Sequence, residues 1–249
     1  MAGHSKFKNI MHRKGAQDKK RAKLFSRLGK EISVAVKESG PDPDKNIRLR
    51  SAVSNAKALN MPKDNIERAI KKGEGNDPDS YFEEVRYEGY GPDGVAIIVE
   101  AMTNNKNRTA AEIRATFNKY GGNLGESGSV SFGFKRLGGI TIDKSLTTEE
   151  DLFDFIADNG SENYEVNDDE YNIYCDQKKL HQLNEKINSK YGQTKFVGLI
   201  WKSENNISIG KDSAEKLFKL LNVLEDNEDV QNVSSNFEVT DEILSSLNV

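Results

Sequence analysis

The pattern of apolar and polar positions near the start of the chain predicts three amphipathic helices. Over residues 19–38 the apolar side chains recur with the period of an α-helix. A second helix over 44–59 repeats this pattern, and a third begins at Pro62 and stops at Gly73. In the first helix, four cations lie on the side opposite the apolar residues: Lys20, Lys23, Arg27 and Lys30. We therefore expect a three-helix domain whose first helix has a buried face and a cationic face.

Beyond residue 80 the apolar runs become short and alternate with turn residues, which predicts strands mixed with helices. The first group should be two strands, a helix capped by Asn107, and a third strand, over 82–87, 95–102, 108–120 and 130–135. The next group should be strand, helix, strand, strand, helix and strand, over 139–142, 148–159, 164–167, 171–175, 177–191 and 196–201. This βαββαβ order is the ferredoxin-like order, which can form a complete domain.

The last predicted elements have no partners of their own. A strand over 207–210, a helix over 214–224 and a strand over 230–239 can complete a domain only by returning to the sheet of strand 95–102. We therefore expect an α+β fold, with an N-terminal three-helix domain followed by two α/β domains, the third inserted into the second. The predicted limits are 1–75 for the basic helical domain, 80–136 plus 204–240 for the discontinuous domain, and 137–203 for the inserted ferredoxin-like domain.

Charge is divided unevenly between the predicted domains. The chain of 249 residues has a formal net charge of -4, but residues 1–75 carry 19 Lys and Arg against 8 Asp and Glu, and the rest carries 17 against 32. The first thirty residues alone hold ten Lys and Arg and a single acid, Asp18. A basic segment in an otherwise acidic protein is typical of binding to a polyanion, and nucleic acid is the first candidate.

The candidate nucleic-acid contacts are the cations and flat rings of this basic region. Lys and Arg neutralise phosphates, and aromatic rings stack on exposed bases. The alternative is a solvated charged surface, but ten cations with one acid would repel one another without a counter-charge. The predicted binding residues are Lys6, Phe7, Lys8, His12, Arg13, Lys14, Lys19, Lys20, Lys23, Arg27, Lys30, Arg50 and Lys57.

A weaker second site is predicted where a polar, basic turn leads into the helix at 108–120. Lys106, Asn107 and Arg108 lie at the start of this helix, and a helix N-terminus can hold phosphate. Ordinary capping of the helix explains the same residues about as well.

Catalytic and metal-binding patterns are weak in this sequence. Gly89, Gly91 and Gly94 match the spacing of a dinucleotide fingerprint, but a strand follows them where a helix is required. The three histidines and Cys175 have no spacing typical of a metal or nucleophile site. The sequence therefore predicts no catalytic residue, metal ligand or cofactor, and we do not expect an enzyme. An enzyme with a pocket between the α/β domains ranks last among the hypotheses.

The compartment follows from cysteine use and hydropathy. A lone cysteine excludes an internal disulfide and is typical of a reducing compartment, so we expect a cytoplasmic protein. No run approaches the roughly 18 apolar residues that a membrane span needs, and no membrane role is expected.

Several long motifs resemble the YebC/PmpR family. The chain begins MAGHSKFKNIMHRKGAQD, and further matches are NMPKDNIERAIKKG (60–73), YEGYGPDG (87–94), NRTAAEIR (107–114) and GGNLG (121–125). Two positions depart from the family pattern, because Phe7 stands where Trp is usual and Met11 where a basic residue is common. The resemblance implies a cytoplasmic three-domain protein that binds DNA and regulates transcription, while other members act in translation on the ribosome.

The nature of the nucleic acid stays open at this point. Cationic helices suit duplex DNA, whereas a basic arm, residues 1–30, with interleaved rings and no obvious recognition helix suits structured RNA. The expected partners are DNA or rRNA, the ribosome in the second case, and a second copy of the chain through the acidic α/β domains.

Overall fold

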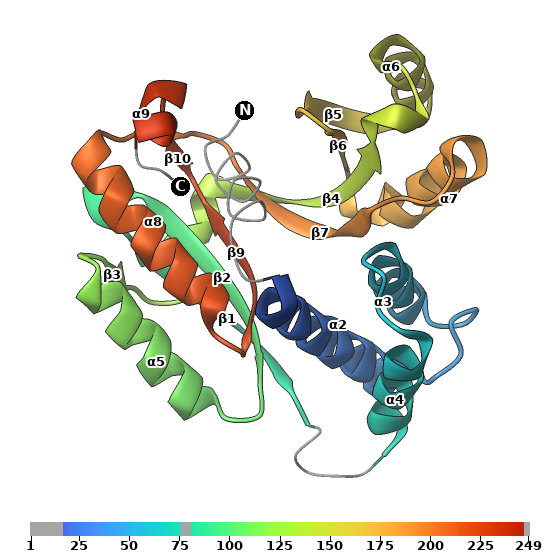
Figure 1. Ribbon diagram of the computed structural model, residues 1–249, viewed down its shortest axis with the longest axis horizontal. Coiled ribbons are helices and arrows are strands. Elements are labelled where there is room, and N and C mark those ends of the chain that lie inside the picture. The colour runs from blue at the N-terminus through green and yellow to red at the C-terminus, as the bar shows by residue number, and fades with distance from the viewer. Residues whose placement is uncertain (1–16, 76–80, 247–249) are drawn as a thin grey trace. The chain divides into compact units, whose positions relative to one another are not determined.

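The computed structural model describes residues 17–75 and 81–246, except for the side chains of residues 17–20 (Figure 1). The described chain forms two compact units. One unit contains residues 28–75 and 136–200, and the other contains residues 17–27, 81–135 and 201–246. The division falls inside the first described helix. The residue limits predicted for the three domains stay predictions.

The three helices predicted near the start of the chain are present: α2 (Gln17–Ser39), α3 (Ile47–Ala58) and α4 (Lys63–Glu74). Asn46 joins the end of α2 to the start of α3. Its side-chain amide donates to the carbonyls of Ala35 and Gly40, at 2.7 and 2.8 Å, and its Oδ1 accepts the N–H of Leu49 at 2.9 Å. Asn46 is only 2 % exposed, so one buried side chain satisfies backbone groups of both helices.

Helix α4 packs closely on the second half of α2. The hydroxyl of Ser33 donates to the carbonyl of Ala69 at 2.8 Å across the two helices. Gly73 allows the backbones to approach, because a Cβ there would lie 2.6 Å from the Ser33 carbonyl oxygen and 2.7 Å from Val36 Cβ. A glycine at this place in α4 is therefore required by the packing.

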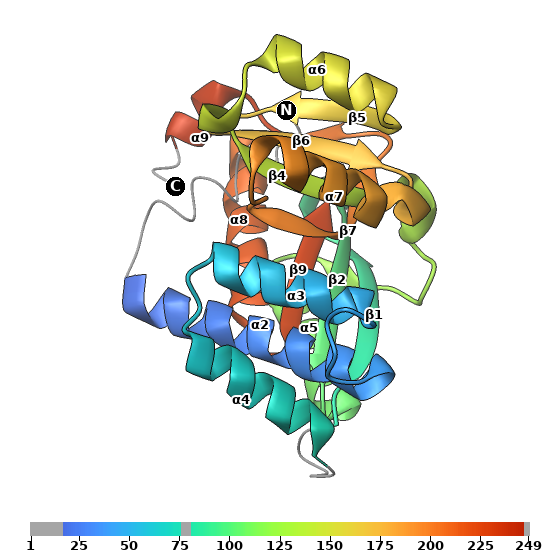
Figure 2. The same cartoon turned by 90° about the vertical axis from the view of Figure 1, so that its right-hand side faces the viewer.

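The same unit contains a four-stranded sheet with the order β5-β6-β4-β7. Its elements follow the βαββαβ order expected from the sequence: β4 (Phe134–Asp143), α6 (Glu149–Asp158), β5 (Ser161–Val166), β6 (Glu170–Cys175), α7 (Leu180–Tyr191) and β7 (Phe196–Ser203). Helices α6 and α7 cover one face of the sheet (Figure 2). Cys175 is buried in the core beneath them, and burial raises the pKa of its thiol to about 11.

The other unit contains a second four-stranded sheet with the order β3-β1-β2-β9. Three strands precede the ferredoxin-like segment and the fourth follows it: β1 (Glu83–Tyr90), β2 (Ala96–Thr103), β3 (Asn123–Leu124) and β9 (Val230–Ser235). Strand β9 pairs antiparallel with β2, with Val99 opposite Val233. The chain thus leaves this sheet, forms the ferredoxin-like sheet and returns. The expected mixed fold, with the third domain inserted into the second, is confirmed.

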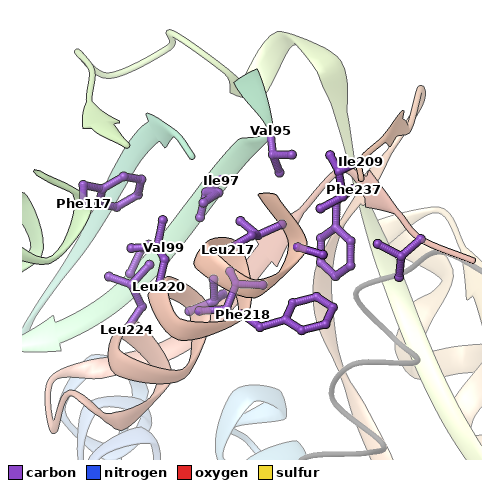
Figure 3. Packing of buried hydrophobic residues seen from close by; sticks show 14 of the residues in the cluster. Val95, Ile97, Val99, Phe117, Ile209, Leu217, Phe218, Leu220, Leu224 and Phe237 are labelled. Atoms are coloured by element: carbon purple, nitrogen blue, oxygen red, sulfur yellow. The ribbon is translucent and has the colours of Figure 1, made fainter. Parts of the chain in front are cut away.

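Two helices cover one face of this sheet, α5 (Lys106–Lys119) and α8 (Lys211–Asp226). Figure 3 shows Leu217 and Leu220 of α8 against Ile97 and Val99 of β2, with Phe117 of α5 nearby. All five side chains are fully buried, and this apolar contact holds the helices on the sheet. The unit is completed by a parallel pair, β8 (Ile207–Ser208) and β10 (Phe237–Glu238), and by α9 (Asp241–Ser246).

The strand predicted over 130–135 is wrong. Residues Ser131–Gly133 form a short 3₁₀ helix, and β4 starts only at Phe134. The cause is Glu88 of β1, whose buried carboxylate accepts the N–H groups of Val130 and Ser131, each at 2.9 Å. Those two donors are therefore bound to a side chain and cannot join a strand ladder.

Candidate nucleic-acid interface

Eight predicted contact residues lie outside what the structure describes. For Lys6, Phe7, Lys8, His12, Arg13 and Lys14 neither backbone nor side chain is described. Lys19 and Lys20 belong to α2, but their side chains lie outside the described part. These residues stay predictions from the sequence.

Lys23 and Arg27 contact the last turn of α8. The ammonium group of Lys23 donates to the Asp226 carbonyl and lies 3.0 Å from its carboxylate, and Arg27 donates to the Glu225 carbonyl. The last carbonyls of a helix have no partner within it and carry partial negative charge, which favours cations there. Burial lowers the pKa of Arg27, while the charges of Glu225 and Asp226 oppose that shift. Arg27 is thus a partly buried packing residue, whereas Lys23 lies at the surface.

Arg50 of α3 is held in a fixed position. Its guanidinium donates to the carbonyls of Pro43 and Asp44, both at 3.0 Å, and its Nη1 lies 3.1 Å from Glu185 Oε1 of α7. Lys57, two turns further along α3, is exposed. Lys30 of α2 is partly buried.

Helix α4 presents cations that the sequence reasoning did not include. Arg68, Lys71 and Lys72 are exposed; Arg68 and Lys71 lie on the side of α4 opposite its buried residues Ile66 and Ala69, and Lys72 lies at the border of that side. Lys71 and Lys72 are in the last turn, where positive charge is favoured by the helix dipole. The spacing of these cations within NIERAIKKG could have identified them.

At the start of α5, two of the three residues of the predicted second site bind acidic side chains of the protein and remain partly exposed. Lys106 pairs with Glu83, and Arg108 donates to Asp229 Oδ2 at 2.6 Å. This hydrogen bond, together with the charge of Asp229, raises the pKa of Arg108. The cap predicted at Asn107 is wrong, because the side chain of Asn105 accepts the N–H of Arg108 at 3.1 Å.

Asp229 is the centre of a buried polar cluster around this helix start. Its Oδ2 also accepts the hydroxyls of Thr103 and Thr109, at 3.1 and 2.7 Å. The cluster joins the end of β2, the first turn of α5 and the residue before β9. The hydrogen bonds of this cluster give Asp229, Thr103 and Thr109 a structural role.

Comparison with known proteins identifies the family. A family model described as the TACO1/YebC protein N-terminal domain matches residues 5–76, and one described as the TACO1/YebC second and third domain matches residues 82–237. The chain belongs to the TACO1/YebC family. This confirms the resemblance seen in the sequence motifs. The second family model is named Transcrip_reg, so the family is described as one of transcription regulators.

A solved structure agrees with this assignment to the TACO1/YebC family. The crystal structure of a conserved hypothetical protein from Aquifex aeolicus is 43 % identical to this chain, with a TM-score of 0.85. The match covers 91 % of this chain and 94 % of the other. The similarity therefore extends over nearly the whole length of both proteins.

Two further observations bear on the site. Among residues 17–75 and 81–246, no group of three or more His, Cys, Asp or Glu side chains is placed to hold a metal ion. Within the same ranges, none of the helices combines the length and apolar character that a membrane crossing requires.

Proposed function

We propose that this protein is a cytoplasmic, nucleic-acid-binding regulator of gene expression that binds DNA through its basic N-terminal region and controls transcription. The observation that carries the proposal is the exposed cationic side of α4, formed by Arg68, Lys71 and Lys72. It adds to the excess of 19 basic over 8 acidic residues in residues 1–75. Clustered cations of this kind bind the phosphate backbone and release its counterions.

The α/β part of the chain has the opposite charge character. Residues 76–249 carry 17 basic against 32 acidic residues, which disfavours close approach of a nucleic acid. We assign to this part the contacts with protein partners, including a second copy of the chain. The proposed nucleic-acid contact is therefore restricted to the basic helical domain predicted over residues 1–75, called the helical region below.

A second candidate is a ribosome-associated translation factor whose basic arm binds rRNA. The observation that favours it is the flat rings of Phe7 and His12 among the cations of the arm, which suit unpaired bases. Duplex DNA offers no such bases to stack on.

The two candidates are separated by measuring binding of the full chain to labelled promoter DNA, scrambled DNA and an rRNA hairpin at physiological salt. A transcription regulator binds the promoter at least about tenfold more tightly than the scrambled duplex, because specific sites differ by several kcal/mol from non-specific ones. Equal affinity for the two duplexes with tighter binding of the hairpin favours the ribosomal role. Binding of none of the three contradicts both.

A further inference from the structure

Two surface cations of the helical region are held by acidic side chains of the α/β segments. Arg50 pairs with Glu185 of α7 at 3.1 Å, and Lys23 pairs with Asp226 at the end of α8 at 3.0 Å. All four side chains remain partly exposed, the carboxylates at 65 % and 72 %. Each pair therefore lies where a ligand from solution can reach it.

The Arg50 pair is supported by a tether that carries no charge. The side-chain amide of Asn55 in α3 donates to the Val197 carbonyl, and its Oδ1 accepts the Val197 N–H, both at 2.9 Å. Strand β7 is an edge of its sheet, so Asn55 takes the place of a neighbouring strand there. Gln193 adds a bond to the carbonyl of Ser54 at 3.4 Å. This tether keeps Glu185 within reach of Arg50.

A carboxylate and a phosphodiester present the same chemistry to a cation. Both offer anionic oxygens that accept charge-assisted hydrogen bonds from guanidinium and ammonium groups. The Nε and Nη2 of Arg50 already donate to backbone carbonyls, so Nη1 is the group that Glu185 occupies. A phosphate that binds at Nη1 therefore competes with the Glu185 carboxylate for the same group.

We propose that Glu185 and Asp226 compete with nucleic acid for Arg50 and Lys23, so that the acidic α/β segments restrain binding by the helical region. The proposal rests on the proposed function and assigns a regulatory role to the acidic groups of the chain. Any event that separates α3 from β7 releases Arg50 and strengthens binding. A nucleic acid that binds weakly does not displace the carboxylates and therefore does not stay bound.

The test compares full-length variants by fluorescence anisotropy with a labelled DNA duplex and a labelled RNA hairpin. Glu185→Gln and Asp226→Asn remove the competing charges, and Asn55→Ala weakens the tether without changing charge. The matched controls are Glu150→Gln in α6 and Asp212→Asn in α8, which change the same charge at exposed positions. Circular dichroism establishes that each variant is folded.

Removing a competitor should tighten binding by about two- to fivefold, the factor that corresponds to an exposed ion pair. The slope of log affinity against log salt should steepen by about 0.9 for each cation released to a duplex. Asn55→Ala should tighten binding as well, which a long-range change in net charge does not produce. The two control variants should bind like the wild type.

The outcomes separate this inference from the proposed function. Binding that is unchanged in Glu185→Gln and Asp226→Asn, or increased equally in the controls, overturns the competition while the proposed function stands. Absence of binding in the wild type and in every variant overturns both. Binding that appears only in the competitor variants supports both.

Discussion

Arg108 at the start of α5 donates a hydrogen bond to Asp229, 2.6 Å away and 121 residues later in the chain. Asp229 is 5 % exposed and also binds Thr103 and Thr109. The pair therefore fixes the point at which the chain rejoins its first sheet after the ferredoxin-like segment. Arg108, which the sequence offers as a secondary phosphate contact, is part of this junction, and the phosphate contact itself stays a prediction.

Replacement of Asp229 by Ala should strongly destabilise the protein. It removes the buried acceptor that Arg108 shares with the hydroxyls of Thr103 and Thr109, a change that costs about 1–3 kcal/mol. Urea denaturation measures this free energy of unfolding. The neighbouring variant Glu228→Ala is the control, because Glu228 is exposed and such substitutions change stability by about 0.5 kcal/mol or less. Equal effects of the two variants would contradict a structural role for the cluster.

The close contact of α4 with α2 predicts the effect of adding one methyl group. Gly73→Ala places a Cβ 2.6 Å from the Ser33 carbonyl, and such overpacking costs about 1–3 kcal/mol. In Gly75→Ala the nearest atom is the Lys72 carbonyl oxygen at 3.4 Å, an ordinary contact. Thermal denaturation should therefore show a lower midpoint for Gly73→Ala only. A stable Gly73→Ala would mean that the two helices do not pack as described.

The buried carboxylate of Glu88 predicts a dependence of stability on pH. Burial raises its pKa, but hydrogen bonds from the Val130, Ser131 and Gly128 N–H groups and the charge of Arg86 outweigh burial, and the net shift is downward. A lowered pKa in the folded state stabilises the protein above the unfolded value of about 4.3, and this contribution is lost as the pH falls through the folded pKa.

Glu88→Gln should therefore be less stable than the wild type at neutral pH, by about 1–3 kcal/mol. The difference should shrink as the pH falls below about 4, because the wild-type carboxyl then becomes protonated. Denaturation midpoints of both proteins across the acid range measure this. A difference that stays constant down to the most acidic pH would exclude the ionised carboxylate as the stabilising group.

The spacing of apolar residues predicted most of the helices and strands, because that spacing depends only on residues that are close in the sequence. The three N-terminal helices, the βαββαβ order and the return of β9 all follow from runs such as Val95–Val99 and from short turns. The strand over 130–135 failed because its N–H groups bind Glu88, more than forty residues earlier. The cap at Asn107 failed because Asn105 is an equally good cap and local sequence does not choose between them.

The sequence predicted the positive charge of the candidate site, but not which acidic residues pair with its cations. The basic composition of residues 1–75 is plain in the sequence. That Arg50 lies beside Glu185, 135 positions away, depends on how α3 packs against β7 and α7. The cations of α4 were predictable as well, because the spacing of Ile66 and Ala69 already places Arg68 and Lys71 on the polar side of a helix.

The central claim is that the cations of the helical region bind the nucleic acid. Two charge-neutralised variants test it: Lys6, Lys8, Arg13 and Lys14 to Gln in the arm, and Arg68, Lys71 and Lys72 to Gln in α4. The matched control changes three exposed lysines of α8 to Gln, Lys211, Lys216 and Lys219. All variants retain the full chain, so a difference in binding between them identifies which cations contact the nucleic acid.

The most direct measurement is the slope of log affinity against log salt for the wild type and these variants, with a labelled DNA duplex. Each phosphate contact that is lost should reduce the slope by about 0.9. We predict a reduced slope and weaker binding for the arm and α4 variants, and an unchanged slope for the α8 control. An unchanged slope in both the arm and the α4 variants, or a reduction confined to the α8 control, would contradict the account.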